Sequence, residues 1–477
     1  MVPERGSGDG AKRQPAPTGA GASLRAMLVP LALAQFICSF AGSNMNVAIS
    51  DIAHDLGTDV HGVQTAITLF LLTMAALMIP GSKLTDRVGR KRCLVAGLAV
   101  YGAGAVIGAL APGLGFLILG YSVFEGVGSA LLIPPVYILT TMLFTDVTSR
   151  AKAFGLISGM AGVGAAAGPL IGGLITTTVS WRASFLLQAA VVAGIIVLSR
   201  RIVDPAPPDP TRSFDTFGAI LSGAGLFFVV VGILQAGNNN ALLALFLAIG
   251  GAFLAWFFAH IRSMERAGKE PLLSTGLFRV RTSNLALVTQ NIQWLILMGI
   301  SFVVSVFLQV VRGYTAIQTG LVFTAATAGV LLSSLAAERL AGRRAQRTLI
   351  AAGFVTTLSG IALMLGFSQI SSNLFVVLLP ALFLIGTGIG VMLTPSVNVV
   401  QSAFPEKLQG EISGLSRSVS NLGSSFGTAI AGTILVSDLA HGNRSYALAL
   451  VAISVIGLIG LGAALLLPRG PAPSATA

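Results

Sequence analysis

Charged residues are scarce in this chain, since Asp, Glu, Lys and Arg make up only 10% of its 477 residues. Soluble domains carry about a quarter charged residues, so this chain lacks the polar surface that a water-exposed fold needs. Hydrophobic residues make up 54% of the chain, and the mean hydropathy is +0.86. The composition therefore excludes a soluble protein and predicts an all-α integral membrane protein.

Cysteine and histidine are also rare, with two and four residues. Cys38 falls inside the first hydrophobic run and Cys93 opens the third, which argues against a disulfide framework or a metal site. The histidines lie near or outside the ends of the hydrophobic runs, so the clustered catalytic groups of a membrane enzyme are missing. We expect no metal, no cofactor and no enzymatic activity.

The net charge of +12 does not indicate a nucleic-acid partner. Basic residues occur in short clusters between apolar runs, without the stripes and interleaved aromatics that hold phosphates. The expected partners are the lipid bilayer, a small-molecule substrate and protons, and the protein is expected to be a monomer.

Fourteen hydrophobic runs, each long enough to cross a bilayer, lie between residues 27 and 468. If the N-terminus is cytoplasmic, only Arg182, Arg312 and Arg444 of the 29 basic residues fall in outside loops, and Arg417 falls within a span. Because positive charge marks cytoplasmic loops, this alternation supports the count. The sequence predicts a multi-pass protein of the cell membrane with both termini cytoplasmic and an outside loop at 51–61.

Two charged segments divide the runs into groups of six, two and six. An internal repeat supports two related halves, because residues 155–175 align with 410–430 with seven identities. The predicted regions are a disordered tail (1–25), an N-terminal six-helix bundle (26–200), a linker (201–214), two additional helices (215–262), a cytoplasmic loop (263–283), a C-terminal six-helix bundle (284–468) and a C-terminal tail (469–477). Two such halves around a midplane site are a plan of secondary transporters.

The segment after the second run is dense in charge and contains two glycines. Gly89 permits an unusual backbone angle, Asp86 can accept from cations or a helix N-terminus, and the basic side chains anchor to the inner leaflet. An ordinary positive-inside loop is the alternative reading. The candidate gate residues are Gly81, Asp86, Arg87, Gly89, Arg90 and Lys91.

The fifth run is rich in glycine around one proline. Glycines at these spacings let helix backbones approach closely in lipid, and Pro169 bends the helix. A dinucleotide-binding reading fails because no strand precedes the glycines. The candidate motif consists of Gly164, Gly168, Pro169, Gly172 and Gly173.

Both motifs resemble signatures of the major facilitator superfamily. The first is similar to G-x-L-a-D-r-x-G-r-k, in which the acid and the cations latch the two halves on the cytoplasmic side. The second is similar to the G-x-x-x-G-P-x-x-G-G signature of antiporters. Leu277–Arg281 and Ile412–Ser416 resemble elements of the fourteen-helix drug:proton antiporter family. The resemblance implies a major facilitator fold of two six-helix bundles plus two extra central helices.

The chain departs from that family pattern at positions that carry charge. Ala41 stands where the family has Asp, and Ser122 and Glu125 stand where it has Arg and Gln. Ser420 replaces a further Arg, while Arg417 lies one turn earlier. Proton coupling therefore cannot be carried over residue by residue.

Glu125 is the one acid near the middle of a span, where an ionised carboxylate costs a few kcal/mol. It is either a permanently neutral hydrogen-bonding group or a proton carrier that ionises when its site hydrates. Arg417 either snorkels or faces the cavity. The candidate coupling residues are Glu125, Arg417 and Ser122. Polar candidates for the cavity lining are Asn44, Asn46, Gln290, Gln293, Asn398 and Asn421.

Together these observations predict proton-coupled export of small amphiphilic or drug-like molecules by alternating access. Few fixed charges in the spans suit lipophilic or weakly charged substrates. The alternatives are an uptake or lipid carrier with atypical coupling, and a non-transporting scaffold or sensor on a transporter fold.

Overall fold

Nearly all of the described chain is helical. The structure is a computed structural model that describes residues 18–144, 147–205, 208–209, 213–236, 239–341, 344–367, 374–405, 408–436 and 443–468. Hydrocarbon offers no partner to backbone polar groups, so a chain this apolar forms helices that satisfy those groups internally. The predicted C-terminal tail and residues 1–17 lie outside these ranges.

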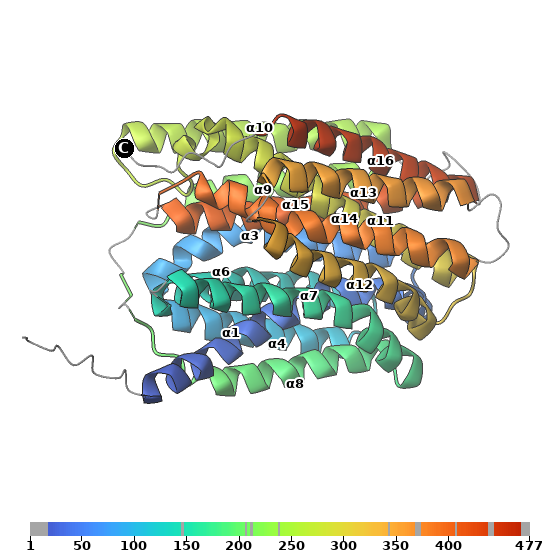
Figure 1. Cartoon of the computed structure of the whole chain (residues 1–477), viewed down its shortest axis with the longest axis horizontal. Helices are drawn as coiled ribbons and strands as arrows, with labels where there is room; N and C mark the ends of the chain where they lie inside the picture. Colours follow the sequence, from blue (N-terminus) through green and yellow to red (C-terminus); the bar gives the residue numbers. More distant parts are fainter. Residues whose placement is uncertain are drawn as a thin grey trace, which may run out of the picture.

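The first six membrane-length segments form the N-terminal bundle, which occupies the lower half of Figure 1. They are α1–η1–α2 (Thr18–Asn44, Met45–Ala48, Ile49–Asp55), α3 (Val60–Val88), α4 (Arg90–Ala109), α5–η2–α6 (Leu114–Leu117, Ile118–Glu125, Gly126–Leu143), α7 (Val147–Thr178) and α8 (Trp181–Ser199).

Two helices, α9 (Thr216–Leu234) and α10 (Asn240–Arg266), pack against each other, and the short η3 (Thr275–Arg279) follows them. The C-terminal bundle, coloured from yellow to red in Figure 1, comes next. Its segments are α11–η4 (Arg281–Val306, Phe307–Val311), α12 (Ala316–Ala341), α13 (Gln346–Phe367), α14 (Leu374–Ser402), α15 (Gln409–Val436) and α16 (Asn443–Leu465).

The prediction of about fourteen membrane helices is confirmed. Within the described ranges, 13 segments are long and apolar enough to cross a membrane. The fourteenth is α15, which has 28 residues. Its serines and Arg417 lower its mean hydropathy, so it is not among the 13. These polar side chains lie at the centre of the molecule, because α15 packs along α3 and α11.

Three helix boundaries differ from the sequence expectation. Helix α1 begins at Thr18, inside the segment expected to be a disordered tail, where Ala and Leu are good helix formers. The outside loop expected at 51–61 shrinks to residues 56–59, because α2 continues to Asp55 and Asp59 caps α3. The gate segment is mostly helical rather than a loop, because α3 runs to Val88 and α4 begins at Arg90.

The Gly89 end carries the turn between α3 and α4, and the Trp181 end carries the turn between α7 and α8. The bundles meet mainly where α3 packs on α15 and α7 packs on α12.

Candidate functional site

At the Trp181 end, two buried glutamines join the bundles. The Gln64 amide of α3 donates to the carbonyls of Thr428 (3.3 Å) and Ala429 (3.1 Å) on α15. The Gln309 amide of η4 donates to the Asn46 carbonyl (2.8 Å) and accepts from the Ser50 backbone N–H (3.0 Å). Each amide side chain thus forms hydrogen bonds with the backbone of the opposite bundle, and neither side chain carries a charge.

Glycines bring α7 and α12 into backbone contact near the same end. A Cβ atom at Gly173 would meet the Ala316 carbonyl, and one at Gly320 would meet the Pro169 carbonyl. The other glycines of the predicted antiporter-like motif face α1, where added Cβ atoms at Gly164, Gly168 and Gly172 would meet Phe36, Ser43 and Asn44. The motif therefore packs α7 against α1 of its own bundle and against α12 of the other bundle.

The predicted gate motif forms the turn of the Gly89 end. Gly89 has φ +104°, a conformation that side chains rarely adopt, as the sequence predicted. The Arg90 guanidinium donates to the Asp86 carboxylate at 2.9 Å, and the backbone N–H of Arg90 donates to Asp204 at 2.8 Å. These contacts connect α3, α4 and the segment after α8.

The remaining residues of the predicted gate motif have separate environments. Gly81 packs on the Ala130 carbonyl, and Arg87 is exposed. The Lys91 ammonium donates to the Arg200 carbonyl.

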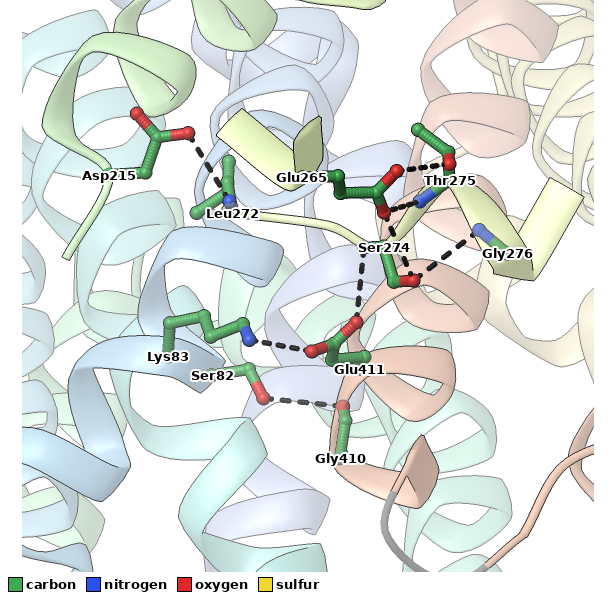
Figure 2. Close-up of polar contacts among 10 residues, drawn as sticks. All are labelled: Ser82, Lys83, Asp215, Glu265, Leu272, Ser274, Thr275, Gly276, Gly410 and Glu411. Carbon is green, nitrogen blue, oxygen red and sulfur yellow. Dashed lines mark hydrogen bonds and ion pairs between the residues drawn. The ribbon is translucent and has the colours of Figure 1, made fainter. Parts of the chain in front are cut away.

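A different pair of charges crosses between the bundles at this end. The Lys83 ammonium donates to the Glu411 carboxylate at 2.6 Å, and Ser82 donates to the Gly410 carbonyl at 3.4 Å (Figure 2). Both charged side chains keep about a fifth of their surface exposed (23% and 20%). The charge pair between the bundles thus joins Lys83 to the first turn of α15.

The segment between α10 and α11 is held at the same junction (Figure 2). The Ser274 backbone N–H donates to the second oxygen of Glu411 at 3.1 Å. Glu265 of α10 accepts from the backbone and the hydroxyl of Thr275. Asp215, which caps α9, accepts from the Leu272 backbone N–H at 3.2 Å. Glu411 is therefore shared by the two bundles and the segment that follows the additional helices.

Between the bundles, a cavity of about 650 Å³ occupies the Gly89 half of the molecule. Its walls come from α3, α6, α7, α14 and α15, and Asp86 and Gly410 place its mouth at the Gly89 end. Most of the lining is apolar or uncharged. Apolar lining residues are Met78, Ile133, Pro134, Ile138, Met142, Phe154 and Val397. Such a cavity has the size of a small-molecule site.

Arg417 faces this cavity, as one of the two sequence readings predicted. Its guanidinium carbon lies 4.5 Å from the centre of the Tyr137 ring, and it donates to the Tyr137 hydroxyl. The Tyr137 hydroxyl in turn donates to the Gln35 side chain at 3.2 Å. Arg417 of one bundle is thus held on an aromatic side chain of the other.

Glu125 lies elsewhere, inside the N-terminal bundle. It ends the π-helical turn η2, and η2 packs so closely on α4 that a Cβ atom at Gly104 would meet the Gly120 carbonyl and the Glu125 backbone. The side chain is 0% exposed and lies beside the Tyr101 hydroxyl. That hydroxyl gives its proton to Gln188 at 2.6 Å, so neither Glu125 oxygen has a hydrogen-bond donor within the described ranges.

The structure does not bring the three coupling candidates together. Ser122 is buried and donates to the Ala66 carbonyl at 2.7 Å, which ties η2 to α3. Glu125 faces α4, whereas Arg417 faces the cavity. Glu125 and Arg417 are therefore not in direct contact, and the helices between them include α6, which follows η2 directly and carries Tyr137.

The six amide candidates lie outside the cavity lining. Asn44 and Asn46 are buried close to the Trp181 end, and Gln290 accepts from Ser416 at 2.9 Å. Gln293 donates to the Ile389 carbonyl at 3.3 Å. Asn398 is exposed and Asn421 is half-buried. Where they bond to protein, these amides satisfy neighbouring helices, the usual role of polar side chains in membrane bundles.

Sequence reasoning missed Lys83, Glu411, Gln64, Gln309 and Tyr137. Gln64 and Gln309 gave a usable signal, because each is a polar side chain close to the end of an apolar run. Lys83 and Glu411 are 328 residues apart in the chain, so their pairing depends on how the bundles are placed.

Comparisons with known proteins agree with this architecture. The chain matches the family model for the Major Facilitator Superfamily over residues 31–428 and again over 286–477. It is 30% identical to the cephamycin export protein CmcT of Amycolatopsis lactamdurans, over 85% of this chain and 84% of that one. It is 29% identical to the multidrug efflux pump LfrA of Mycolicibacterium smegmatis (86% and 80%) and to the puromycin resistance protein pur8 of Streptomyces alboniger (85% and 81%).

Among solved structures, the fold is similar to that of a peptide transporter, POT, in complex with sulfate. The TM-score is 0.68, with 17% identity, over 93% of this chain and 96% of the other. At that identity the likeness concerns the fold alone.

Proposed function

The chain belongs to the major facilitator superfamily, and from this premise we propose that it exports small amphiphilic or drug-like molecules in exchange for protons. The relatives named for export of cephamycin, multidrug efflux and resistance to puromycin support the direction and the class of substrate. Alternating access between two bundles is the expected mechanism.

One observation carries this proposal: the interface between the bundles is closed at one end and hollow at the other. Gln64, Gln309 and the α7–α12 glycine contact join the bundles at the Trp181 end. The 650 Å³ cavity reaches the Gly89 end. This arrangement is the one expected of a carrier that receives substrate from the Gly89 side and has yet to open at the opposite end.

The Gly89 end is the cytoplasmic end in this proposal. Arg87, Lys91 and Arg92 lie there, and so do Arg200 and Arg201 at the end of α8, as the positive-inside rule requires. Both termini then lie in the cytoplasm, and the protein works as a monomer in the cell membrane.

Glu125 is the proposed proton carrier. Its carboxyl group is fully buried without a donor, and only the protonated form can donate to the Tyr101 oxygen, so that form suits the closed site. Release of the proton requires water to reach η2. Since Ser122 ties η2 to α3, and α3 packs on α15 of the other bundle, a change at Glu125 reaches the interface through these helices.

Transport by the purified protein in proteoliposomes under an imposed pH gradient tests the proposal. We expect accumulation of at least one member of a panel of amphiphilic compounds, driven by the gradient and abolished by its collapse. If the transport rate does not depend on the pH gradient, the proposed exchange for protons is wrong. A protein that moves no member of the panel, although folded, would instead indicate a scaffold or sensor.

A further inference from the structure

The cavity contains two charged side chains, and only one of them has a partner of opposite charge among the described residues. Asp86, at the mouth, accepts from Arg90 at 2.9 Å. Arg417 lies deeper and forms no ion pair within the described ranges. An arginine at membrane depth is costly unless an anion or another acceptor satisfies it, so this side chain has the character of a binding group.

The geometry around Arg417 leaves it able to bind. A guanidinium group has five N–H donors, and one contact goes to the Tyr137 hydroxyl. The guanidinium carbon lies 4.5 Å from the centre of the Tyr137 ring, so the ring and its hydroxyl hold the group in place while other N–H donors are left for an oxyanion. Arg417 is half-buried, so it is partly desolvated yet accessible from the cavity.

Aromatic and apolar side chains continue the same wall. The Phe154 ring is stacked beside the Tyr137 ring, with centroids 6.0 Å apart and an interplanar angle of 21°. Met78 and Met142 also line the cavity, and methionine adapts to irregular aromatic ligands. A flat apolar body therefore has a surface to pack on, next to a fixed cation.

We propose that the substrates of this cavity are aromatic amphiphilic anions, with a carboxylate, sulfonate or phosphate bound by Arg417 and a flat apolar body packed on Tyr137 and Phe154. This assignment of substrate class rests on the proposed transport function. The same cavity disfavours organic cations, because Asp86, the acid among its described lining residues, is already paired and Glu125 is fully buried outside it.

The test compares two permanently charged probes of nearly the same shape, naphthalene-2-sulfonate and (2-naphthylmethyl)trimethylammonium, in proteoliposomes. Neither probe titrates, so a pH gradient changes the driving force and not the probe. We expect the wild type to transport the sulfonate about ten-fold faster than the ammonium. Arg417→Gln should lower the ratio of the two rates by about 10- to 100-fold, because a hydrogen bond to a charged group is lost.

Two variants control the comparison. Arg417→Lys keeps the charge without the fork of donors, so it should retain most of the preference for the anion. Arg266→Gln removes an exposed arginine in the last turn of α10 and should leave the ratio unchanged. Thermal stabilisation of the detergent-solubilised wild type by the sulfonate, absent in Arg417→Gln, provides a readout that does not depend on transport.

Several results would overturn the assignment. If Arg417→Gln slows both probes equally, Arg417 acts in the movement of the bundles and not in recognition. If the wild type prefers the ammonium, or moves neither naphthalene probe while still transporting other compounds, the anion class is wrong and the transport function stands. If it transports nothing at all, the proposed function itself fails.

Discussion

At the Trp181 end the bundles meet through neutral groups, whereas at the Gly89 end they meet through a charge pair beside a cavity. Gln64 and Gln309 are buried and bond to backbone, and leaving a buried polar group unpaired costs about 1–3 kcal/mol. Lys83 and Glu411 are partly exposed, and pairs of that kind contribute about 0.2–1 kcal/mol.

This difference in free energy indicates at which end the contacts between the bundles break first. Water can replace the partners of Lys83 and Glu411 when the bundles separate, but it reaches Gln64 and Gln309 only after the helices have moved. The contacts at the Trp181 end therefore stabilise this conformation more strongly than the contacts at the Gly89 end do.

The largest effect is expected from Gly173→Val on α7. The new side chain would meet the Ala316 carbonyl of the opposite bundle, and overpacking of this kind costs about 1–3 kcal/mol. Closure of the Trp181 end should be disfavoured, and the initial rate of transport should fall at least about ten-fold at equal expression. Gly159→Val, on the same helix with open space around it, is the matched control. Equal loss in both variants would mean that helix propensity and not the interface is responsible.

The second effect concerns Asp86, whose carboxylate pairs with Arg90 at 2.9 Å. Asp86→Asn keeps the shape but removes the charge, so the protein should insert normally while transport falls by about ten-fold. Arg90→Ala should behave similarly, because the two groups form one pair. Arg92→Ala, which removes an exposed cation two residues away, should transport normally. Near-normal turnover of Asp86→Asn would mean that the motif only sets the orientation in the membrane, as an ordinary positive-inside loop does.

A smaller effect is expected from the pair that crosses the bundles. Lys83→Gln should change the transport rate by two- to five-fold, since about 1 kcal/mol corresponds to roughly that factor. Lys83→Arg, which preserves the ion pair, should lie close to wild type. Lys152→Gln removes an exposed lysine on α7 and serves as the control. A ten-fold or greater loss in Lys83→Gln alone would show that the Gly89 end is held more firmly than its exposure suggests.

The assignment of sides can be tested without any change in transport. Val179 is 74% exposed at the Trp181 end, and Lys269 is exposed after α10. Val179→Cys should react with an impermeant thiol reagent on intact cells, and Lys269→Cys only after the membrane is opened. The reverse pattern of labelling would place the Gly89 end outside.

The sequence predicted the family, the membrane fold and the number of helices, because apolar runs and basic clusters are local signals. Gly89 was predicted for the same reason, since a tight turn between helices needs a positive φ. Partner choice was not predictable. The amide of Gln64 reads like any polar residue in a membrane helix until α15 is placed beside it.

In the candidate site, too, the sequence indicates which residues are unusual but not where the fold places them. Glu125 and Arg417 stand out in the sequence as charges inside apolar runs, but their separation into bundle interior and cavity depends on which face of each helix is buried. Their roles in transport remain predictions.

We propose that Glu125 couples protons to transport from inside the N-terminal bundle, without touching the cavity. Glu125→Gln mimics the protonated form, so substrate exchange across a membrane without a gradient should persist at nearly the wild-type rate. Accumulation driven by a pH gradient should be lost, because no proton can be released in each cycle. Parallel measurement of exchange and of gradient-driven accumulation in proteoliposomes tests this directly. If Glu125→Gln still concentrates substrate as the wild type does, Glu125 is a neutral hydrogen-bonding residue and the coupling acid lies elsewhere.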